Sequence, residues 1–360
     1  MTESSPVSQF DHAKAEAFAN RLVGALNEGA LALMTSLGHR VGLFDALAQW
    51  PEATSQSLAD KAGLAERYVR EWLGVMTTSG VVAYDPGTRT FTLPPEHAAF
   101  VTRAAAPNNI AVTSQFIGVV AGVEDEMVDR FRDGDGTHYH HYDRFHEVMG
   151  EDSAQTVVAA LTEHILPIVP GLLERLRTGI EVTDVGCGRG RAMLHLAQAF
   201  PASSFRGIDL CPAAFAETQA EALRKNLGNL TFEAQDLSEA ETLGGCDLIT
   251  AFDAVHDQRD PQGLVRLVFD SLNEDGVFLM QDIGGSRDLA TNINNPFAPL
   301  LYTISLMHCT PISLGQGGPG LGAMWGVETA QEFLALAGFE QVEMRNLPHD
   351  PINAYFIAHR

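Results

Sequence analysis

The sequence predicts an α/β protein in which a mainly parallel sheet follows a mainly helical N-terminal part. From Ile180 onward, short strand-like runs alternate with helical segments, a pattern typical of parallel strands joined by crossover helices. Between Ser57 and Leu93, two short helical segments precede two strand-like runs, which is the order of a winged helix. A glycine-rich turn directly follows the first strand-like run of the sheet.

The composition is that of a globular and strongly acidic protein. Its 360 residues contain 46 Asp+Glu and 23 Lys+Arg, which leaves a formal net charge of −23. The length exceeds what one hydrophobic core usually serves. We therefore expect a winged-helix domain over 1–100, a helical linker over 101–178 and a sheet domain over 179–360. The charge argues against nucleic-acid and anionic membrane partners, because both need clustered Lys and Arg.

The N-terminal segment and the cysteines predict a soluble, cytoplasmic protein. Residues 1–20 are polar and charged, and they lack the apolar core of a signal peptide. The apolar stretch Ile110–Gly122 is too short to span a bilayer. The four cysteines form no C-x-x-C pair, which fits reduced thiols better than a disulfide framework or a zinc site.

The N-terminal part is predicted to be a dimerisation module. Leucines recur at helical spacing between Ala13 and Ala48, so we expect long amphipathic helices there. A helix over Glu66–Ser79 precedes a hairpin that turns at Asp85-Pro86-Gly87. Basic and acidic residues balance across the winged helix, which makes a poor phosphate-binding face. We therefore expect its apolar helices to bury against a second chain.

Seven strands are predicted in the C-terminal part. The first five are joined by helical segments, and the last two follow each other without a helix and should pair as a hairpin at the sheet edge. The predicted strands are Glu181–Val185, Phe205–Leu210, Leu230–Ala234, Asp247–Phe252, Val277–Asp282, Gln341–Leu347 and Ala354–Ala358.

The turn after the first strand predicts a cofactor site. Gly186, Gly188 and Gly190 allow a ligand close to the backbone, and a helix N-terminus follows with unpaired N–H groups. Asp209 ends the next strand, where an acid can hold two ribose hydroxyls. A dinucleotide fingerprint would need a small residue where this chain has Arg191. The remaining alternative is a doubly wound domain that binds another nucleotide.

These features together resemble the class I S-adenosylmethionine-dependent methyltransferases of the two-domain bacterial type with an N-terminal winged helix. The resemblance covers Ile180–Arg360 and implies a seven-stranded Rossmann-like sheet with S-adenosyl-L-methionine (SAM) as cofactor. It implies that the three glycines pass under the methionine part of SAM, with Asp184 near its amino group. The other implied contacts are Asp209 and Leu210 at the ribose, Asp236 and Leu237 at the adenine, and Phe252 and Asp253 at the methyl-donor region.

His256, followed by Asp257, is the predicted general base. It comes just after the fourth strand, and an imidazole with an ordinary pKa of about 6.5 suits a base near neutrality. The resemblance adds that two-domain small-molecule O-methyltransferases carry their catalytic histidine at this place. The alternative is a capping or packing histidine at a strand–helix junction.

A second cluster, THYHHYDRFHEVMG, lies in the predicted linker. The spacing of Tyr139, Tyr142 and His146 would put them on one helical face. The segment can be a solvated polar stretch, a metal site or a lid over the substrate. No acid or cysteine stands at ligand spacing for a metal, and we prefer the lid because the segment lies in the linker that would cover the open end of the sheet. We thus expect Tyr142 and His141 to assist catalysis, Tyr139, His140 and His146 to line the substrate pocket, and no bound metal.

A long insertion, Gly284–Gly326, is too apolar for an exposed loop. It should roof a mostly apolar pocket, with Tyr302, His308 and Trp325 among the lining residues. Its glycine run, Gly315–Gly322, suggests hinge motion or close backbone approach.

The sequence thus predicts a homodimeric, metal-independent enzyme that methylates an oxygen or a thiol sulfur of a small molecule from SAM. A thiol needs less help to ionise than an alcohol, since its ordinary pKa is about 8.5. The opposing prediction is a winged-helix transcriptional regulator that senses SAM. Methylation of protein or RNA needs an open cleft, which the apolar roof disfavours.

Overall fold

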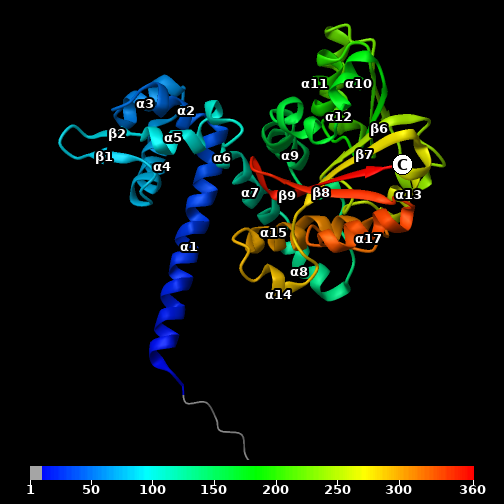
Figure 1. Cartoon of the computed structure of the whole chain (residues 1–360). Helices are drawn as coiled ribbons and strands as arrows, with labels where there is room; N and C mark the ends of the chain where they lie inside the picture. Colours follow the sequence, from blue (N-terminus) through cyan, green and yellow to red (C-terminus); the bar gives the residue numbers. More distant parts are fainter. Residues whose placement is uncertain (1–9) are drawn as a thin grey trace, which may run out of the picture. The chain divides into compact units, whose positions relative to one another are not determined.

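The computed structural model describes residues 10–360, in which two compact units are distinct (Figure 1). One unit ends at Ile117 and the other spans Gly118–Arg360. The segment 101–178, predicted as one helical linker, is thereby divided between them. None of the helices in residues 10–360 combines the length and the apolar character that crossing a membrane requires.

The N-terminal unit contains the predicted winged helix. Its helices are α1 (His12–Arg40), α2 (Leu43–Gln49), α3 (Ser55–Ala62), α4 (Glu66–Thr78) and α5 (Pro95–Val101), with the wing formed by β1 (Ala83–Asp85) and β2 (Thr90–Thr92). The predicted turn forms because the Asp85 carboxylate accepts a hydrogen bond from the Gly87 N–H at 2.8 Å. Phe44, Leu58, Leu73 and Met76 are fully buried and form the centre of this unit's core.

Helix α1 packs against the winged helix only through its C-terminal part. There the Trp72 indole donates to the Met34 carbonyl at 2.9 Å, and a Cβ at Gly38 would lie 2.5 Å from the Trp72 ring. Toward the N-terminus, the large apolar side chains of α1 are exposed within the chain; they are Phe18, Leu22, Val23 and Leu26. An apolar face of this kind is stabilised when another apolar surface covers it.

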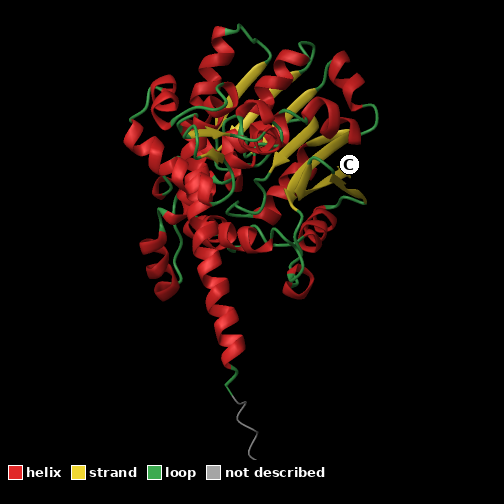
Figure 2. Cartoon of the chain, turned by 90° about the vertical axis from the view of Figure 1, so that its left-hand side faces the viewer, coloured by secondary structure: helices red, strands yellow, loops and turns green. Residues whose placement is uncertain are grey.

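The second unit is built on a seven-stranded sheet with the order β5-β4-β3-β6-β7-β9-β8. Figure 2 shows its strands surrounded by helices. The strands are β3 (Glu181–Val185), β4 (Ser204–Asp209), β5 (Leu230–Ala234), β6 (Cys246–Phe252), β7 (Leu272–Ile283), β8 (Gln341–Leu347) and β9 (Asp350–His359). The first five run parallel, and β8 and β9 form the predicted antiparallel hairpin. Strands β7 and β9 are longer than predicted, because β7 begins at Leu272, which pairs with Cys246 of β6, and β9 begins at Asp350, which pairs with Leu347 of β8.

Each face of the sheet has its own apolar core. Along β7, Val277 and Leu279 join one core, and Phe278 and Met280 join the other, as the alternation of a strand requires. Helices α10 (Leu172–Thr178) and α11 (Arg191–Ala199) contribute to the first core, with Ala222 of α12 (Pro212–Arg224). Helices α13 (Pro261–Ser271) and α17 (Val327–Ala337) contribute to the second. This double cover leaves the strand ends as the accessible edges of the sheet.

Two segments far apart in sequence are bound together beside the sheet. The first comprises η2 (Tyr139–His141) and α9 (Phe145–Ser153), which follow α8 (Glu124–Asp133). The second is the insertion, which is helical and contains α14 (Leu289–Asn292), α15 (Ala298–Ile304), the π-helix η7 (Ser305–Cys309) and α16 (Thr310–Gly315). The Thr137 N–H donates to the Pro311 carbonyl at 2.8 Å, and a Cβ at Gly136 would lie 1.9 Å from the Gly315 nitrogen. Only glycines permit backbones this close.

Candidate active site

The glycine turn lies between β3 and α11, as predicted. Its glycines adopt the left-handed conformation, with φ values of 69° at Gly186, 52° at Gly188 and 67° at Gly190. A Cβ at Gly186 would lie 2.5 Å from the Ala254 Cβ, and one at Gly190 would lie 2.2 Å from the Phe232 ring. Nothing lies within 4 Å of a Cβ built at Gly188, so the turn has one open side. The turn is therefore held by close packing and still accessible to a ligand.

Asp209 links this turn to the end of the neighbouring strand. One carboxylate oxygen accepts from the Gly188 N–H and the other from the Cys211 N–H, both at 2.8 Å. Leu210, the next residue, is exposed. A carboxylate fixed at this edge by two backbone donors still has lone pairs free to accept further hydrogen bonds.

Asp236 lies two residues after the end of β5 and caps the N-terminus of a short 3₁₀ helix, η6 (Leu237–Glu239). Its Oδ1 accepts from both the N–H and the hydroxyl of Ser238, while its Oδ2 lies 3.9 Å from Arg259. Leu237 beside it is buried in the second core. The half-exposed carboxylate and the backbone next to it are placed to meet a polar ring edge.

Two carboxyl groups, the buried Asp184 and the partly buried Asp253, lie at this end of the sheet. Burial raises the pKa of each to about 7. Asp184 accepts a hydrogen bond from Thr250 on β6 at 2.6 Å. Asp253 adopts a φ of 56°, and within residues 10–360 its Oδ1 has no hydrogen-bond partner. The same oxygen lies 4.0 Å from His256 Nδ1, and the side chain is 22% exposed, so this carboxylate has a free oxygen that fits the cationic methionine part of SAM.

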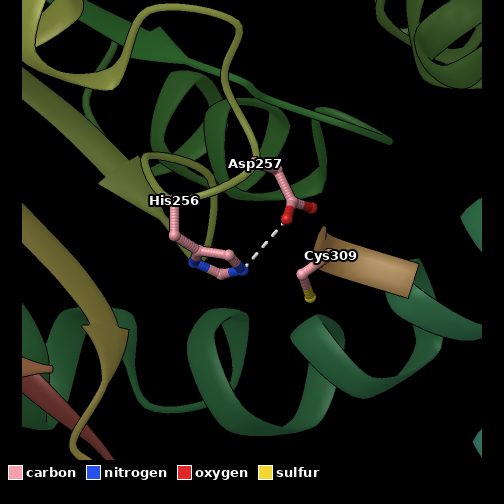
Figure 3. A group of neighbouring side chains, drawn as sticks. All are labelled: His256, Asp257 and Cys309. Carbon is pink, nitrogen blue, oxygen red and sulfur yellow. Dashed lines mark ion pairs between the residues drawn. The ribbon is translucent and has the colours of Figure 1, made fainter. Parts of the chain in front are cut away.

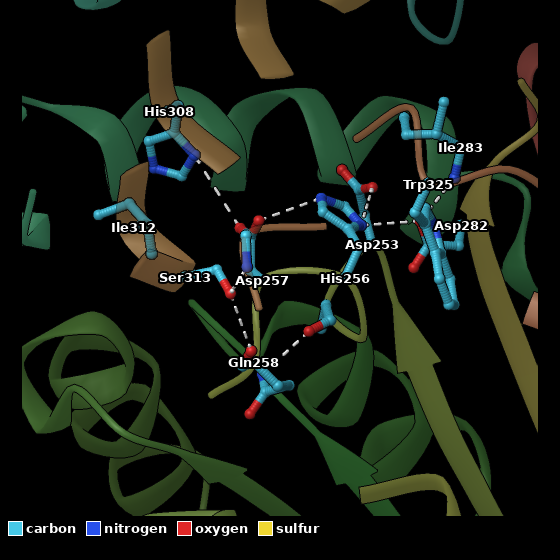
Figure 4. A network of polar contacts seen from close by, with 12 residues as sticks. Asp253, His256, Asp257, Gln258, Asp282, Ile283, His308, Ile312, Ser313 and Trp325 are labelled. Atoms are coloured by element: carbon cyan, nitrogen blue, oxygen red, sulfur yellow. Dashed lines mark hydrogen bonds and ion pairs between the residues drawn. The ribbon is translucent and has the colours of Figure 1, made fainter. Parts of the chain in front are cut away.

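His256 lies at the centre of a buried polar network (Figure 4). Its Nδ1 donates to Asp282 Oδ1 at 2.7 Å, and its Nε2 lies 3.2 Å from Asp257 Oδ1. The same Asp282 oxygen accepts from the Trp325 indole N–H at 3.0 Å and from the Ile283 N–H at 2.8 Å. Each nitrogen of the imidazole therefore faces a carboxylate.

This arrangement makes His256 a cation in the structure. Burial alone lowers the pKa of His256, but the charges of Asp282 and Asp257 outweigh burial and hold that pKa well above its usual value. Burial likewise opposes the charge of Asp257, and the His256 imidazolium overcomes it and lowers the pKa of Asp257. The network is thus an ion triad with protons on both nitrogens of the ring.

A second buried histidine, His308, shares Asp257 with His256. Its Nδ1 lies 3.9 Å from Asp257 Oδ2, and its ring stacks on Phe145 with centroids 3.7 Å apart. Burial lowers the pKa of His308 to about 4, so this imidazole is neutral. Among the described side chains, none is a hydrogen-bond partner of its buried Nε2. His308 lies on the π-helix η7, a type of irregularity that is frequent at functional sites.

Cys309 completes the centre beside His256 and Asp257 (Figure 3). One potential ligand atom from each of these three residues lies within 4.8 Å of the other two, and the same holds for Asp253, His256 and Asp282, so either group could hold a metal ion. Burial raises the pKa of the Cys309 thiol to about 12, which keeps the sulfur protonated at neutral pH. His256 and Asp257 form an ion pair, with His256 Nε2 3.2 Å from Asp257 Oδ1.

The predicted histidine-tyrosine cluster is only partly assembled at this site. Tyr139 and His146 come together, with ring centroids 5.2 Å apart, and Tyr139 lies 5.8 Å from His308. They are not on one helical face as predicted, because η2 ends at His141 and a new helix begins at Phe145. Two short helices joined by a turn bring these rings together instead.

Three other residues of this cluster have roles different from those predicted. His140 is exposed. His141 pairs with Glu126 of α8 at 3.2 Å and accepts from the His138 N–H, so its ring is engaged away from His256. Tyr142 is buried, and its hydroxyl contacts Thr137 Oγ1 at 2.8 Å and donates to the Met307 carbonyl at 2.7 Å. This hydroxyl therefore joins the segment before α9 to the insertion and is not free to contact a methyl acceptor.

Aromatic residues of the insertion form hydrogen bonds both within the insertion and to Asp282 beside His256. Tyr302 accepts from the Asn292 side chain at 3.0 Å and packs with the apolar residues of the roof. Trp325, predicted to line the pocket, instead lies behind His256, because its indole N–H donates to Asp282 and its ring packs in the second core. Asp282 itself was missed by sequence reasoning. Its signal is a single acid near the end of the buried run VFLMQDI, where an isolated charge needs a partner.

The sheet order, the terminal hairpin and the glycine turn after β3 together define a class I methyltransferase fold. Comparison with known proteins agrees. A family model described as "Rv2258c-like winged HTH domain" matches residues 29–103, and one described as "Methyltransferase domain" matches residues 176–308. The chain therefore joins a winged helix-turn-helix domain to a class I, SAM-dependent methyltransferase domain.

Curated relatives match over a limited stretch. A trans-aconitate 2-methyltransferase of Deinococcus radiodurans is 33% identical over 101 residues, which is 28% of this chain and 37% of that protein. A nocamycin O-methyltransferase of Saccharothrix syringae is 32% identical over 93 residues, 25% of this chain and 33% of that protein. The chain thus matches little more than a third of the length of these relatives.

Solved structures match over nearly the whole chain. Human N-acetylserotonin methyltransferase in complex with SAM has a TM-score of 0.68 at 14% identity, covering 99% of both chains. An O-methyltransferase family protein from Burkholderia thailandensis has a TM-score of 0.65 at 15% identity, covering 95% of this chain and 98% of that one. At these identities the likeness is one of fold.

Proposed function

We propose that the protein is an enzyme that transfers a methyl group from SAM to an oxygen or a thiol sulfur of a small molecule. The observation that carries this proposal is the adjacency of two sites at one sheet edge. Strands β3 and β6 are parallel neighbours, so the glycine turn after β3 lies beside the Asp253–Asp257 segment after β6. The 2.5 Å separation between a Cβ at Gly186 and the Ala254 Cβ measures this closeness. The proposed SAM site thereby lies next to the titratable side chains of the Asp253–Asp257 segment, which can donate and accept protons.

The residues present fit SAM at the cradle. The Gly186–Gly190 turn, Asp209 and the Asp236–Leu237 segment would hold it, with Asp253 and Asp184 supplying negative charge for its cationic part. When bound, SAM supplies an electrophilic methyl group for in-line displacement. The protein's own part is to orient the acceptor, exclude water and take its proton. We place the proton-accepting function within the His256–Asp257–His308 centre, which includes the predicted base.

Lid segments support a small acceptor rather than a macromolecule. The Thr137–Pro311 backbone bond and the Tyr142 hydroxyl close one segment onto the other beside His308. A protein or nucleic-acid substrate would need these contacts to open. The four free cysteines support the predicted cytoplasmic location.

The winged helix is proposed to dimerise rather than to bind nucleic acid. The arginines of α4 are paired, since Arg67 forms an ion pair with Glu71 and Arg70 with Glu66. Paired arginines leave little positive charge for phosphates. The exposed apolar side chains of α1 fit a second copy of this chain, with which they would form a shared helical interface.

Calorimetric titration with SAM and the S-adenosylhomocysteine product tests the proposal first, followed by transfer of labelled methyl to small acceptors. We expect micromolar or tighter SAM binding and label in a low-molecular-mass product. A Leu22→Asp/Leu26→Asp variant should elute as a monomer in size-exclusion chromatography, with the fold retained by circular dichroism. SAM-dependent binding of duplex DNA at physiological salt, without methyl transfer, would instead support the regulator.

A further inference from the structure

We propose that His308 takes the acceptor's proton through Nε2, while His256 remains a fixed cation that holds Asp257 in place. This inference rests on the proposed function and names the class of acceptor: an uncharged hydroxyl or thiol compound. It moves the base from the histidine that the sequence indicates to one that only the folded chain brings to the site.

His256 has no free lone pair in the structure. Its Nδ1 is 2.7 Å from one carboxylate and its Nε2 is 3.2 Å from another. Nδ1 donates a hydrogen bond to Asp282, and the ion pair of Nε2 with Asp257, together with the raised pKa of His256, favours hydrogen on Nε2 as well. Asp282 is itself fixed by the Trp325 indole and the Ile283 N–H, which leaves His256 no room to turn away from it. The ring is therefore a donor on both sides.

His308 has the opposite arrangement. Its Nδ1 faces Asp257 Oδ2 at 3.9 Å, which favours hydrogen on that nitrogen and leaves the lone pair on Nε2. That Nε2 is buried and has no hydrogen-bond partner in the part of the chain that the structure describes. Stacking on Phe145 at an interplanar angle of 15° fixes the plane of the ring. A buried acceptor without a donor costs free energy unless a ligand supplies one.

The charges around His308 keep it neutral. Burial lowers its pKa to about 4, and Asp257 opposes this while His256 and His146 add to it. The remaining titratable neighbours are Tyr139, Tyr142 and Cys309; burial raises the pKa of all three, which keeps them uncharged near neutral pH. His308 Nε2 thus keeps a free lone pair at every pH near neutrality.

A weakly basic imidazole suits late proton transfer. The new bond forms between the acceptor's oxygen or sulfur and the methyl carbon, as the donor's C–S bond breaks and its electron pair stays on the donor sulfur. The methylated oxygen or sulfur then carries a positive charge, which makes its hydrogen far more acidic than an imidazolium, so His308 Nε2 takes the proton. Asp257 stabilises the resulting imidazolium, and solvent removes the proton when the product leaves.

The same charges select the acceptor. Three buried carboxyl groups, Asp253, Asp257 and Asp282, surround a single imidazolium, so the site has an excess of negative charge. A carboxylate acceptor would be repelled there and would present no hydrogen to His308 Nε2. An uncharged O–H or S–H group satisfies that nitrogen.

Nitrogen-detected protonation states test the inference without catalysis. Protein labelled with ¹⁵N-histidine is measured by NMR at pH 7, with His308→Gln, His256→Gln and the exposed His164→Gln variants used for assignment. We expect two protonated nitrogens on His256 and hydrogen only on Nδ1 of His308. An unprotonated nitrogen on His256, or hydrogen on His308 Nε2, would overturn the inference even if the protein methylates small molecules.

Steady-state kinetics provide a second, independent test of the inference. With SAM saturating, kcat of the wild type should vary less than about threefold between pH 5.5 and 8.5, whereas a His256 base would require kcat to rise about tenfold per pH unit below its raised pKa. His308→Gln keeps an acceptor atom but takes no proton, so kcat should fall about 100-fold or more while SAM affinity and acceptor KM stay within a few fold. His164→Gln should match the wild type. A normal kcat in His308→Gln would contradict the inference, and absence of any methyl transfer by the wild type would contradict the proposed function instead.

Discussion

The two ends of the active site are built by different means. At the cofactor end, backbone conformation defines the site, since three glycines at positive φ form the cradle and Asp209 fixes it through two N–H groups. At the acceptor end, side chains define the site, and His256 pairs with Asp257 and Asp282 away from solvent. The cofactor end leaves backbone and carboxylate atoms available, whereas the acceptor end leaves buried side-chain atoms without hydrogen-bond partners, among them His308 Nε2.

Because of this difference, the two ends should respond differently to amino-acid substitution. A backbone cradle tolerates almost no added atom, because its geometry depends on close packing. A side-chain network tolerates conservative replacement of one member in structural terms but changes the charge of all the others.

The cofactor cradle should be lost when a side chain enters it at a packed position. Gly186→Val combines a φ of 69° with a Cβ only 2.5 Å from the Ala254 Cβ, so we expect SAM affinity to fall more than about 100-fold. Gly188→Ala is the matched control, because it has a similar φ and open space around the Cβ. Calorimetry should find a loss of less than about tenfold for Gly188→Ala. Equal losses in the two variants would mean that packing against Ala254 does not form the cradle.

Proton transfer to His308 should become unnecessary when the methyl acceptor ionises on its own. In His308→Gln, methylation of a small thiol should recover about tenfold per pH unit up to the thiol's pKa of about 8.5. An aliphatic alcohol should not recover, because it stays protonated over that range. Initial rates between pH 6.5 and 9.5 measure both. Parallel recovery of the two acceptors would show that His308 does not handle the proton.

SAM binding should depend on pH through the buried carboxyl groups of the cofactor end. Asp253, whose pKa burial raises to about 7, is mostly protonated at pH 6 and mostly ionised at pH 8. Since a cation binds the ionised form, the titration of Asp253 alone should raise SAM affinity about tenfold over these two pH units, and that of Asp184 should add to the rise; the affinity falls as the pH drops through 7. Asp253→Asn should reduce this dependence, leaving the part due to Asp184. An affinity that decreases toward pH 8 would contradict the assignment.

A smaller effect is expected where the two lid segments are joined. Tyr142→Phe removes the hydroxyl that contacts Thr137 and the Met307 carbonyl, which should cost about 1–2 kcal/mol of stability and lower kcat several fold by loosening the π-helix. Tyr302→Phe is the control, because it removes a hydroxyl bonded only to Asn292 on the roof. Thermal unfolding and kcat, measured together, check this. A larger loss of kcat in Tyr302→Phe would place the critical contact elsewhere in the roof.

The sequence predicted the cofactor end better than the acceptor end, for a physical reason. The glycines, Asp209 and the strands are local signals, and the predicted strands Glu181–Val185, Leu230–Ala234 and Gln341–Leu347 agree with the structure at both ends. The acceptor end depends on side chains from segments far apart in the chain. Helical spacing could not show that the chain turns between His141 and Phe145, nor that Asp282 reaches His256.

Trp325 illustrates the same limit. An aromatic residue in an apolar insertion predicts a pocket wall, and only the fold reveals that its indole supports Asp282 from behind. His308 was found as a pocket residue from the composition of the insertion, but its neutrality follows from burial, which a sequence does not give. The π-helix that carries His308 also leaves no distinct pattern in the chain.

The most direct test of this account is transfer of labelled methyl from SAM at pH 7.5 to matched acceptor pairs, each an uncharged alcohol, phenol or thiol set against the corresponding carboxylic acid. Gly186→Val serves as the cofactor-binding control. We predict that label enters the uncharged member of the pairs and that none enters with Gly186→Val. Label in the carboxylic acids, or in protein or nucleic acid added to the same reaction, would contradict the account.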